Sequence, residues 1–298
     1  MATLTAPTRA RAVPGHRRRA AVSRGRLPGR VLAYAFALVT FGLSVFPVYW
    51  MVRTALEPTA DINHGTPTLL PTNVTGRNFV NAVHQRNFPT DLRNSLLVSL
   101  STVVLTLLLG FLAAAALARF RFRGRSLYLV GLLVVQMIPL EALIVPVYLS
   151  LRDINGLDQF PSLIVVYLFF SLPFSIWMLR SFIVSIPDEL EEQAMVDGCS
   201  RMGAFLRVLL PLISPGLVAV AVYAFIQAWS EFVFVLVIMQ HSDHYTLPRW
   251  VAGFQTSKGI DWGAQMAGSA LFTLPVIVFF LFVQRRITTG LAAGAVKG

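Results

Sequence analysis

The sequence predicts an all-α polytopic membrane protein with six transmembrane helices. Three observations predict this class: 55% of the 298 residues are hydrophobic, only 13% are charged, and long apolar runs recur along the chain. Soluble domains carry about 25% charged residues, whereas about 20 apolar helical residues cross the hydrocarbon core of a bilayer. We therefore expect helices that span a membrane rather than pack into a soluble core.

Six apolar runs are long enough to span. They cover residues 31–52, 95–118, 127–151, 160–179, 217–239 and 264–283. Helices are the expected form, because a segment exposed to lipid must satisfy its own backbone hydrogen bonds. The third run contains one carboxylate, Glu141, and the fifth contains another, Glu231, while the other four runs are uncharged. The first run is too long for a cleaved signal peptide and lacks a convincing cleavage site.

The basic residues predict how these helices are oriented. The chain has 25 Lys and Arg against 14 Asp and Glu. Of the 25 basic residues, 18 fall in residues 1–30, in the connections after the second and fourth runs, and in the C-terminal tail. The other 7 fall in the connections after the first, third and fifth runs, which lie on the opposite side of the membrane. The positive-inside rule then places both termini in the cytoplasm. Residues 1–30 hold eight arginines and no acid, and we interpret them as a basic tail at anionic lipid headgroups, not as a nucleic-acid-binding arm.

Several other classes of site are not expected. A single cysteine, Cys199, excludes an internal disulfide and a cysteine metal cluster. No phosphate-binding Gly-x-x-x-x-Gly-Lys-Ser/Thr motif occurs, and nothing resembles a hydrolase site, so we predict a chain that is not an enzyme. Four histidines lie in outside loops without metal-ligand spacing, and we interpret them as solvated and predict no metal site. They are His64, His84, His241 and His244.

The fourth connection, residues 180–211, is acidic although it lies on the inside. Pro187 suits the first position of a helix, and the acidic side chains that follow lie near the positive end of the helix dipole. Gly198 can end such a helix in the left-handed conformation. The residues predict a short helix over 187–198 at the membrane surface. Taken alone, it could also be an amphipathic connector that rests at the interface.

The spacing in this connection resembles the signature loop of ATP-binding-cassette importer permeases. That pattern is Glu-Ala-Ala, three residues, Gly, nine residues, then Ile-x-Leu-Pro, and this chain has it from Glu192 to Pro211, with Gln193 for the first Ala and Val208 for Ile. The resemblance implies a coupling helix that seats in a cleft of a separate ATPase. The coupling residues it implies are Glu191, Glu192, Gln193, Ala194, Asp197, Gly198 and Pro211.

Other segments narrow the resemblance to carbohydrate-uptake permeases, specifically the shorter membrane subunit of maltose and other sugar transporters. These segments are residues 46–51, 56–58, 137–139, 146–149, 228–232 and 284–298. One departure is Ser230, which stands where the family usually has Asn. The resemblance implies a type I importer permease domain over residues 31–298. It comprises an extracytoplasmic loop at 53–94, a cytoplasmic coupling loop at 180–211 and a cytoplasmic tail at 284–298.

The resemblance also implies a set of partners. They are a second permease subunit in a heterodimer, two ATP-binding-cassette ATPase subunits, an extracytoplasmic solute-binding protein and a sugar. ATP and Mg²⁺ would be used by the ATPases, and this chain would bind no cofactor. The expected location is the plasma (inner) membrane of a bacterium or archaeon. Contact with the binding protein is expected from residues 53–94 and 241–261.

Polar residues within spans are costly and therefore suggest function. Candidate residues of the substrate path are Gln136, Glu141, Tyr223, Gln227, Trp229, Ser230 and Glu231. A sugar requires hydrogen-bonding groups and aromatic surfaces, which these residues offer. Glu231 either lines the path or bonds a neighbouring helix. Glu141 lies in a span broken by Pro139 and Pro146, and it borders either the path or the outer docking surface.

Three other functions remain open at this point. One is an importer of the same type for another small solute, such as an osmolyte, peptide or amino acid. The second is a self-sufficient ion- or proton-coupled carrier that uses Glu141 and Glu231. The third, a structural scaffold, explains neither carboxylate.

Overall fold

The computed structural model describes residues 27–64, 68–71, 73–84, 87–256 and 259–294. The chain divides into two compact units, residues 1–49 and 50–298, and helix α1 (Leu27–Ala55) contains the boundary. Within the first unit the described part is helical and carries no charge from residue 31 onward. The predicted basic tail lies outside the described residues up to position 26.

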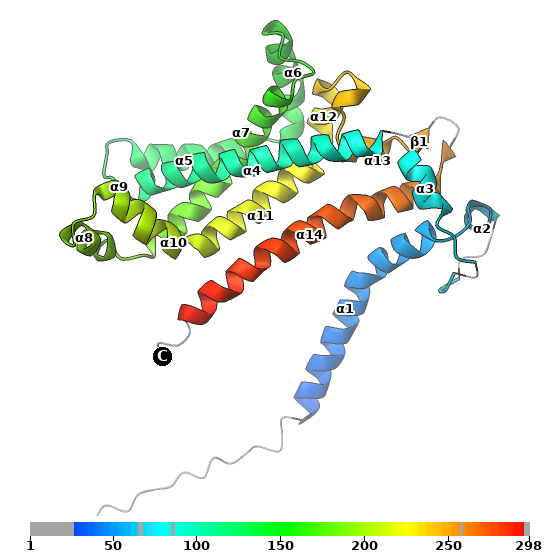
Figure 1. Ribbon diagram of the computed structural model, residues 1–298, viewed down its shortest axis with the longest axis horizontal. Coiled ribbons are helices and arrows are strands. Elements are labelled where there is room, and N and C mark those ends of the chain that lie inside the picture. The colour runs from blue at the N-terminus through cyan, green and yellow to red at the C-terminus, as the bar shows by residue number, and fades with distance from the viewer. Residues whose placement is uncertain (1–26, 65–67, 72, 85–86, 257–258, 295–298) are drawn as a thin grey trace, which may run out of the picture. The chain divides into compact units, whose positions relative to one another are not determined.

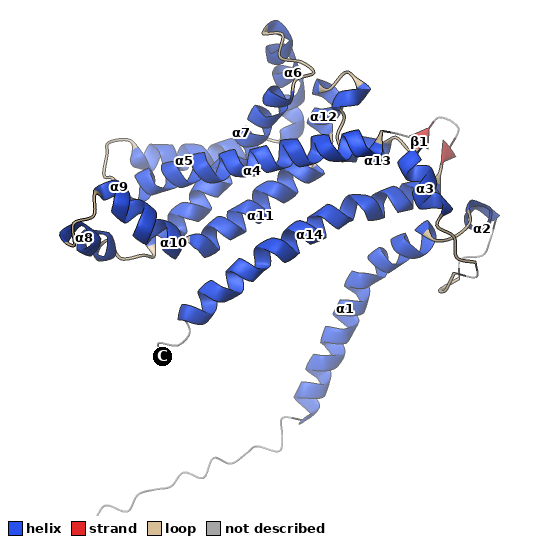
Figure 2. Cartoon of the chain, in the orientation of Figure 1, coloured by secondary structure: helices blue, strands red, loops and turns tan. Residues whose placement is uncertain are grey.

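The second unit is built almost entirely from helices, as Figure 2 shows. Its long helices are α4 (Phe88–Arg119), α7 (Phe160–Val184), α11 (Ser214–Ser230) and α14 (Trp262–Gly294). Helix α4 packs along α7, and α11 lies against α4, α7 and α14 (Figure 1). The all-α prediction is confirmed. In the described chain the exception is one antiparallel pair of two-residue strands, β1 (Gln255–Thr256) and β2 (Gly259–Ile260).

The number of candidate spans agrees with the sequence. Four helices are long and apolar enough to cross a membrane: α1, α4, α7 and the part of α14 up to Gln284. Two pairs of shorter helices, bent by 93° and 71°, raise the number to six if each pair is one span. The first pair covers the third predicted run, which contains Glu141. The second pair runs from Arg201 to Ser230, so it overlaps the fifth predicted run only over residues 217–230 and ends before Glu231.

Buried aromatic and aliphatic side chains hold the long helices together. Phe225 and Trp229 of α11 stack on Phe279 and Phe272 of α14, with ring centroids 4.0 and 5.8 Å apart. Within a membrane such contacts stabilise the fold through close van der Waals packing rather than through removal from water. Helix α7 approaches α11 so closely at Gly216 that a Cβ there would lie 2.7 Å from a neighbouring ring. The packing therefore fixes a glycine at the start of α11.

The third span is broken after α5 (Arg125–Gln136). The chain then forms the 3-10 turn η2 (Leu140–Leu143) and helix α6 (Ile144–Asp153). Pro139 is extended, with ψ 133°, and the carbonyl of Val135 accepts the N–H of Ile138 at 3.3 Å. Pro139 breaks the span as predicted, but Pro146 does not. Pro146 lies in the first turn of α6, where its missing N–H would have had no helical partner.

The fifth span is also interrupted, which corrects the prediction of a continuous helix over 217–239. Helix α11 ends at Ser230, Glu231 is extended with ψ 125°, and α12 (Val233–Ile238) begins two residues later. The side chain of Glu231 accepts backbone N–H groups at the start of α12. A carboxylate that bonds nearby backbone N–H groups favours a helix start over a helix interior. This is the physical reason that the helix breaks here.

The described residues of the predicted outer loop at 53–94 include two short helices, α2 (Thr59–His64) and α3 (Arg77–His84). Arg53 and Glu57 form a buried ion pair one helical turn apart. The Nδ2 of Asn78 donates to the carbonyls of Ala55 and Glu57 at 3.0 and 2.7 Å. These bonds fasten α3 to the end of α1, so this region has the character of a small subdomain.

The connections gather at two ends of the bundle (Figure 1). At the end where α4 finishes lie α8 (Glu189–Val196), α9 (Arg201–Ala204), the π-helical turn η3 (Phe205–Leu209) and α10 (Leu210–Leu212). At the end where α4 begins lie α3, the turn η4 (Ser242–His244) and α13 (Leu247–Ala252). The two ends carry the candidate sites described next.

Candidate functional site

The short acidic helix expected at residues 187–198 is present as α8. It begins after Asp188, so Pro187 precedes the helix rather than occupying its first position. At its other end Gly198 has φ +94°. The N–H of Gly198 bonds the carbonyl of Met195 at 3.1 Å, and the N–H of Cys199 bonds that of Ala194 at 2.9 Å. This pair of bonds is the Schellman arrangement, and it confirms that Gly198 ends the helix in the left-handed conformation.

Arg119, the last residue of α4, holds α8 in place. Its Nε donates to Glu191 at 2.7 Å, its Nη1 pairs with Asp188, and its Nη2 donates to the carbonyl of Ile186 at 3.2 Å. The side chains of Arg119 and Glu191 are only 14% and 17% exposed. A cation at a helix C-terminus also interacts favourably with the helix dipole. These contacts attach α8 and the residues before it to the C-terminal end of α4.

The chain leaves α8 through a second, irregular helical segment. The hydroxyl of Ser200 accepts the N–H of Gly203 at 3.1 Å and so caps α9. The segment then widens into the π-helical turn η3, in which the N–H of Leu210 bonds the carbonyl of Phe205. Pro211 follows and has no N–H to donate. The segment therefore reaches the sharp bend before α11 without a regular helix.

Most of the predicted coupling residues point outward from this end of the molecule. Glu191 and Ala194 are half-buried, and the others on α8 and at its end are exposed: Glu192, Gln193, Asp197 and Gly198. The apolar side chain of Val196 is 87% exposed and that of Met195 is 37% exposed. A cavity of about 550 Å³ lies between α8, α9 and the end of α4, lined in part by Arg119 and Glu192. Such an exposed apolar and acidic end suits contact with another protein.

A second candidate site surrounds Glu231. Its Oε2 accepts the hydroxyl of Tyr167 at 2.8 Å, and its Oε1 accepts the N–H of Phe234 at 2.9 Å. Glu231 also lines a cavity of about 280 Å³, together with Gln227 and Ser230. The carboxylate therefore has partners within its own chain while one side faces open space. Both roles considered for Glu231, structural pairing and lining a path, agree with this geometry.

The other predicted path residues do not share this cavity. Trp229 is 1% exposed, and its Nε1 donates to the carbonyl of Phe272 at 3.2 Å, so it belongs to the core. Tyr223 packs on Phe174 with ring centroids 4.3 Å apart and accepts the amide of Gln227 at 3.4 Å. Gln136 and Glu141 are exposed at the break of the third span, outside the residues that line the cavity.

The loop histidines differ from the prediction in one respect. His241 is 77% exposed, as expected of a solvated residue, but its Nδ1 lies 2.5 Å from Oδ2 of Asp158, and Nδ1 of His244 lies 2.9 Å from the same oxygen. Nδ1 of His84 lies 2.8 Å from the carbonyl oxygen of Val80, one turn earlier in α3. The side chain of His64 lies outside the described ones.

Asp158 is the centre of this histidine cluster. Partial burial acts to raise its pKa, but the N–H groups of Gln240 and His241 and the two imidazole rings outweigh burial and lower the pKa to about 2. The N–H groups of Gln240 and His241 bond its Oδ1 at 2.8 and 3.1 Å. Asp158 is therefore an ionised carboxylate at any physiological pH, with one oxygen held by backbone and the other facing two imidazoles.

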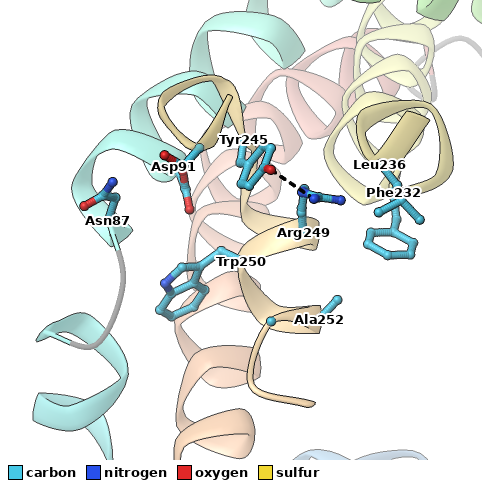
Figure 3. Close-up of a pocket in the computed structure, with 10 residues that line it drawn as sticks. Asn87, Asp91, Phe232, Leu236, Tyr245, Arg249, Trp250 and Ala252 are labelled. Carbon is cyan, nitrogen blue, oxygen red and sulfur yellow. Dashed lines mark hydrogen bonds between the residues drawn. The ribbon is translucent and has the colours of Figure 1, made fainter. Parts of the chain in front are cut away.

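A further cavity, of about 500 Å³, opens at the same end of the bundle and is drawn in Figure 3. Its lining includes Asn87, Asp91, Tyr245, Arg249 and Trp250. The Nη2 of Arg249 donates to the hydroxyl of Tyr245 at 3.0 Å, and the guanidinium lies 4.0 Å from the centre of that ring. This cavity falls within the loops expected to contact a solute-binding protein.

The comparison with known families decides what this arrangement is. Residues 91–292 match the family of binding-protein-dependent transport system inner membrane components. The chain belongs to this family. The match includes α8 and its connection, the interrupted fifth span and most of α14, so the permease assignment made from residues 192–211 is confirmed.

Curated relatives are similar to this permease over nearly their whole length. The diacetylchitobiose uptake system permease protein DasC of Streptomyces coelicolor is 44% identical over 91% of this chain and 98% of the relative. The trehalose transport system permease protein SugB of Mycobacterium tuberculosis is 37% identical over 86% of this chain and 94% of the relative.

Solved structures show the same fold. A chain of a bacterial transporter involved in the import of the acidic polysaccharide alginate superposes with a TM-score of 0.76, at 19% identity, over 88% of this permease and 98% of that chain. The six-span permease architecture expected from the resemblance is thereby confirmed.

Three residues of these sites are not predicted from the sequence. Arg119 is one of the basic residues of an inside connection, and an arginine that ends a span beside an acidic loop is itself a signal of pairing. Tyr167 lies in an apolar run and gave no signal. Asp158 is 83 residues from His241, and only the fold brings them together.

Proposed function

We propose that this permease forms, with a second permease subunit, the pathway by which a sugar is taken up, driven by ATP that two separate ATPase subunits hydrolyse. The observation that carries the proposal is α8, a short exposed helix closed by a left-handed Gly198 and fastened to α4 by Arg119. A rigid, exposed element tied to a long span can pass motion from a docked protein to the membrane helices.

The distribution of charge supports the direction of transport. The connections that carry α8 and the end of α4 belong to the side with 18 of the basic residues, which is the cytoplasmic side by the positive-inside rule. The ATPases would then dock on α8 from the cytoplasm, and both termini would lie there. The end with α3, η4 and α13 would face outward, where a solute-binding protein delivers the substrate.

The relatives support a sugar as the substrate. DasC and SugB are named for diacetylchitobiose and trehalose uptake, and they are 44% and 37% identical to this permease. A sugar has hydroxyl groups on all sides, and the cavity beside Glu231 offers carboxylate, amide and hydroxyl groups from Glu231, Gln227 and Ser230. We propose that these three residues border the path, while Trp229 and Tyr223 support them by packing.

The proposed mechanism is alternating access. ATP-driven closure of the two ATPases would move α8, and the pair between Arg119 and Glu191 would transmit this movement to α4. Since α4 packs along α7 and against α11, the helices on both sides of the Glu231 cavity would shift together. ATP and Mg²⁺ would act on the ATPases, and this permease would supply no catalytic group.

An ion-coupled carrier finds less support. Such a carrier would use Glu141 and Glu231 as coupling groups, but Glu141 is exposed at the break between α5 and α6 and does not line the cavity that contains Glu231. Glu231 moreover bonds Tyr167 and the backbone of α12. These bonds would have to be exchanged in every proton or ion cycle.

The proposed function is tested by ATP hydrolysis of the complete transporter in lipid vesicles. The permease is reconstituted with its second permease, ATPases and solute-binding protein, and hydrolysis is measured against a panel of mono-, di- and oligosaccharides. We expect one class of saccharide to stimulate hydrolysis, and to be taken up, only when the binding protein is present. If an amino acid or an osmolyte stimulates hydrolysis and no saccharide does, the sugar assignment is wrong. If this permease takes up substrate without ATP, the assignment as an ATP-driven importer is wrong.

A further inference from the structure

Two connections far apart in sequence meet at Asp158. One joins α6 to α7, and the other joins α12 to α13 and contains η4. The N–H of Asp158 bonds the carbonyl of Ile238 at 3.0 Å, and its Oδ1 accepts the N–H groups of Gln240 and His241. These backbone contacts fix Asp158 against the second connection, so the position of its other oxygen, Oδ2, is well defined.

Both histidines of the second connection turn a ring nitrogen towards that oxygen. They are three positions apart, and η4 is a 3-10 turn, in which side chains at i and i+3 lie on the same side. One ligand atom from each of Asp158, His241 and His244 lies within 4.8 Å of the other two, and both Nδ1 atoms lie close to Oδ2 of Asp158. The ring of His244 packs edge-on against Phe160, with centroids 5.2 Å apart, which holds its orientation.

We propose that Asp158, His241 and His244 form a binding site for a divalent transition-metal ion, with zinc as the best fit. Two imidazole nitrogens and one carboxylate oxygen are a ligand set that zinc uses when it keeps a fourth position open for water or another ligand. Ligand distances of 2.0–2.2 Å place neighbouring tetrahedral ligand atoms about 3.3 Å apart. The distances from Oδ2 to the two imidazole nitrogens, 2.5 and 2.9 Å, differ from this spacing by less than about 1 Å.

The surroundings of the cluster favour this ligand. Metal-binding carboxylates are normally oriented by further hydrogen bonds, and Oδ1 of Asp158 has two from the backbone. His241 and His244 are 77% and 40% exposed, so an ion can enter from solvent and the rings can adjust. Calcium and magnesium prefer all-oxygen sites, and two imidazoles make the cluster a poor one for them.

A bound ion would link the α6–α7 connection to the α12–α13 connection through three coordination bonds. This link would stiffen this end of the bundle. The inference does not depend on what the permease transports, because it rests on three ligand atoms and their spacing alone. A test of metal binding therefore stands apart from the test of sugar uptake.

The test is calorimetric titration of the purified full-length permease with zinc chloride, using an affinity tag without histidine and protein first treated with a chelator. We expect one zinc ion per chain, with magnesium and calcium giving no saturable heat. Asp158→Asn and His244→Ala should each weaken zinc binding by about tenfold or more. His84→Ala removes an outer-loop histidine outside the cluster and should leave binding unchanged.

Cobalt provides a second readout that does not depend on the variants folding normally. Cobalt(II) bound to the unaltered protein should show the visible absorption of a four- or five-coordinate nitrogen and oxygen site, and zinc should displace it. Absence of saturable zinc binding, or equal binding by the His241→Ala, His244→Ala double variant, would overturn the proposal. The three residues would then form only a hydrogen-bonded fastening between the two connections.

Discussion

Replacing Gly198 with valine is expected to abolish ATP-driven uptake while the permease still inserts in the membrane. Gly198 has φ +94°, a conformation that costs a residue with a side chain about 1–2 kcal/mol and a β-branched residue more. A Cβ at this position meets no atom within 4 Å, so the effect comes from backbone strain and not from a clash. The bonds to Met195 and Ala194 that end α8 would be lost.

The measurement compares uptake and ATP hydrolysis in reconstituted transporters. Gly124 offers a matched control, because it has φ +92°, also has no atom within 4 Å of a Cβ, and lies in a different connection. We expect Gly198→Val to reduce uptake at least tenfold, whereas Gly124→Val, which carries the same conformational penalty, retains most of it. Equal uptake in the two variants would contradict the coupling role of Gly198.

Reversing the charge of Arg119 is expected to have an effect of similar size. Arg119→Glu would place a carboxylate against Asp188 and Glu191 where a three-way contact now exists. A carboxylate at this part-buried position would repel Asp188 and Glu191 instead of pairing with them, and α8 would separate from α4. Uptake should fall to background while the ATPases retain some hydrolysis that no longer responds to sugar.

Two further variants separate this effect from general damage. Arg123→Glu makes the same change of charge at an exposed position of the next connection and should leave uptake nearly unaltered. The double variant Arg119→Glu, Glu191→Arg restores opposite charges and should recover part of the uptake. If the double variant is no better than Arg119→Glu, the pair does not carry the coupling, and the idea that α8 drives α4 through it is wrong.

The sequence predicted the apolar spans and the short helix of the connection at 180–211 well, because both depend on local patterns. Apolar runs of about 20 residues report membrane helices directly, and the spacing from Glu192 to Pro211 is contained in one connection. The left-handed Gly198 was expected for the same reason, since a helix end is a local event. Pro139 broke its span as predicted.

The sequence predicted tertiary partners poorly, because they depend on packing. The end of α11 at Ser230 follows from bonds that Glu231 makes to the backbone beyond it and to Tyr167, which no periodicity reveals. Trp229 appeared to be a surface for sugar, yet it fills the core between α11 and α14. The pair of Arg119 with Glu191 and the cluster at Asp158 each bring together residues more than 60 positions apart. A single sequence does not show that such distant residues meet.

The most direct test of the central claim, that α8 is the element on which the ATPase acts, uses the single cysteine of the permease. Cys199 directly follows Gly198 and is partly exposed, so it can carry a photoreactive cross-linker without any substitution. In the assembled transporter we predict a cross-link from Cys199 to an ATPase subunit. A cross-link to lipid or to the solute-binding protein, with none to the ATPase, would contradict the account.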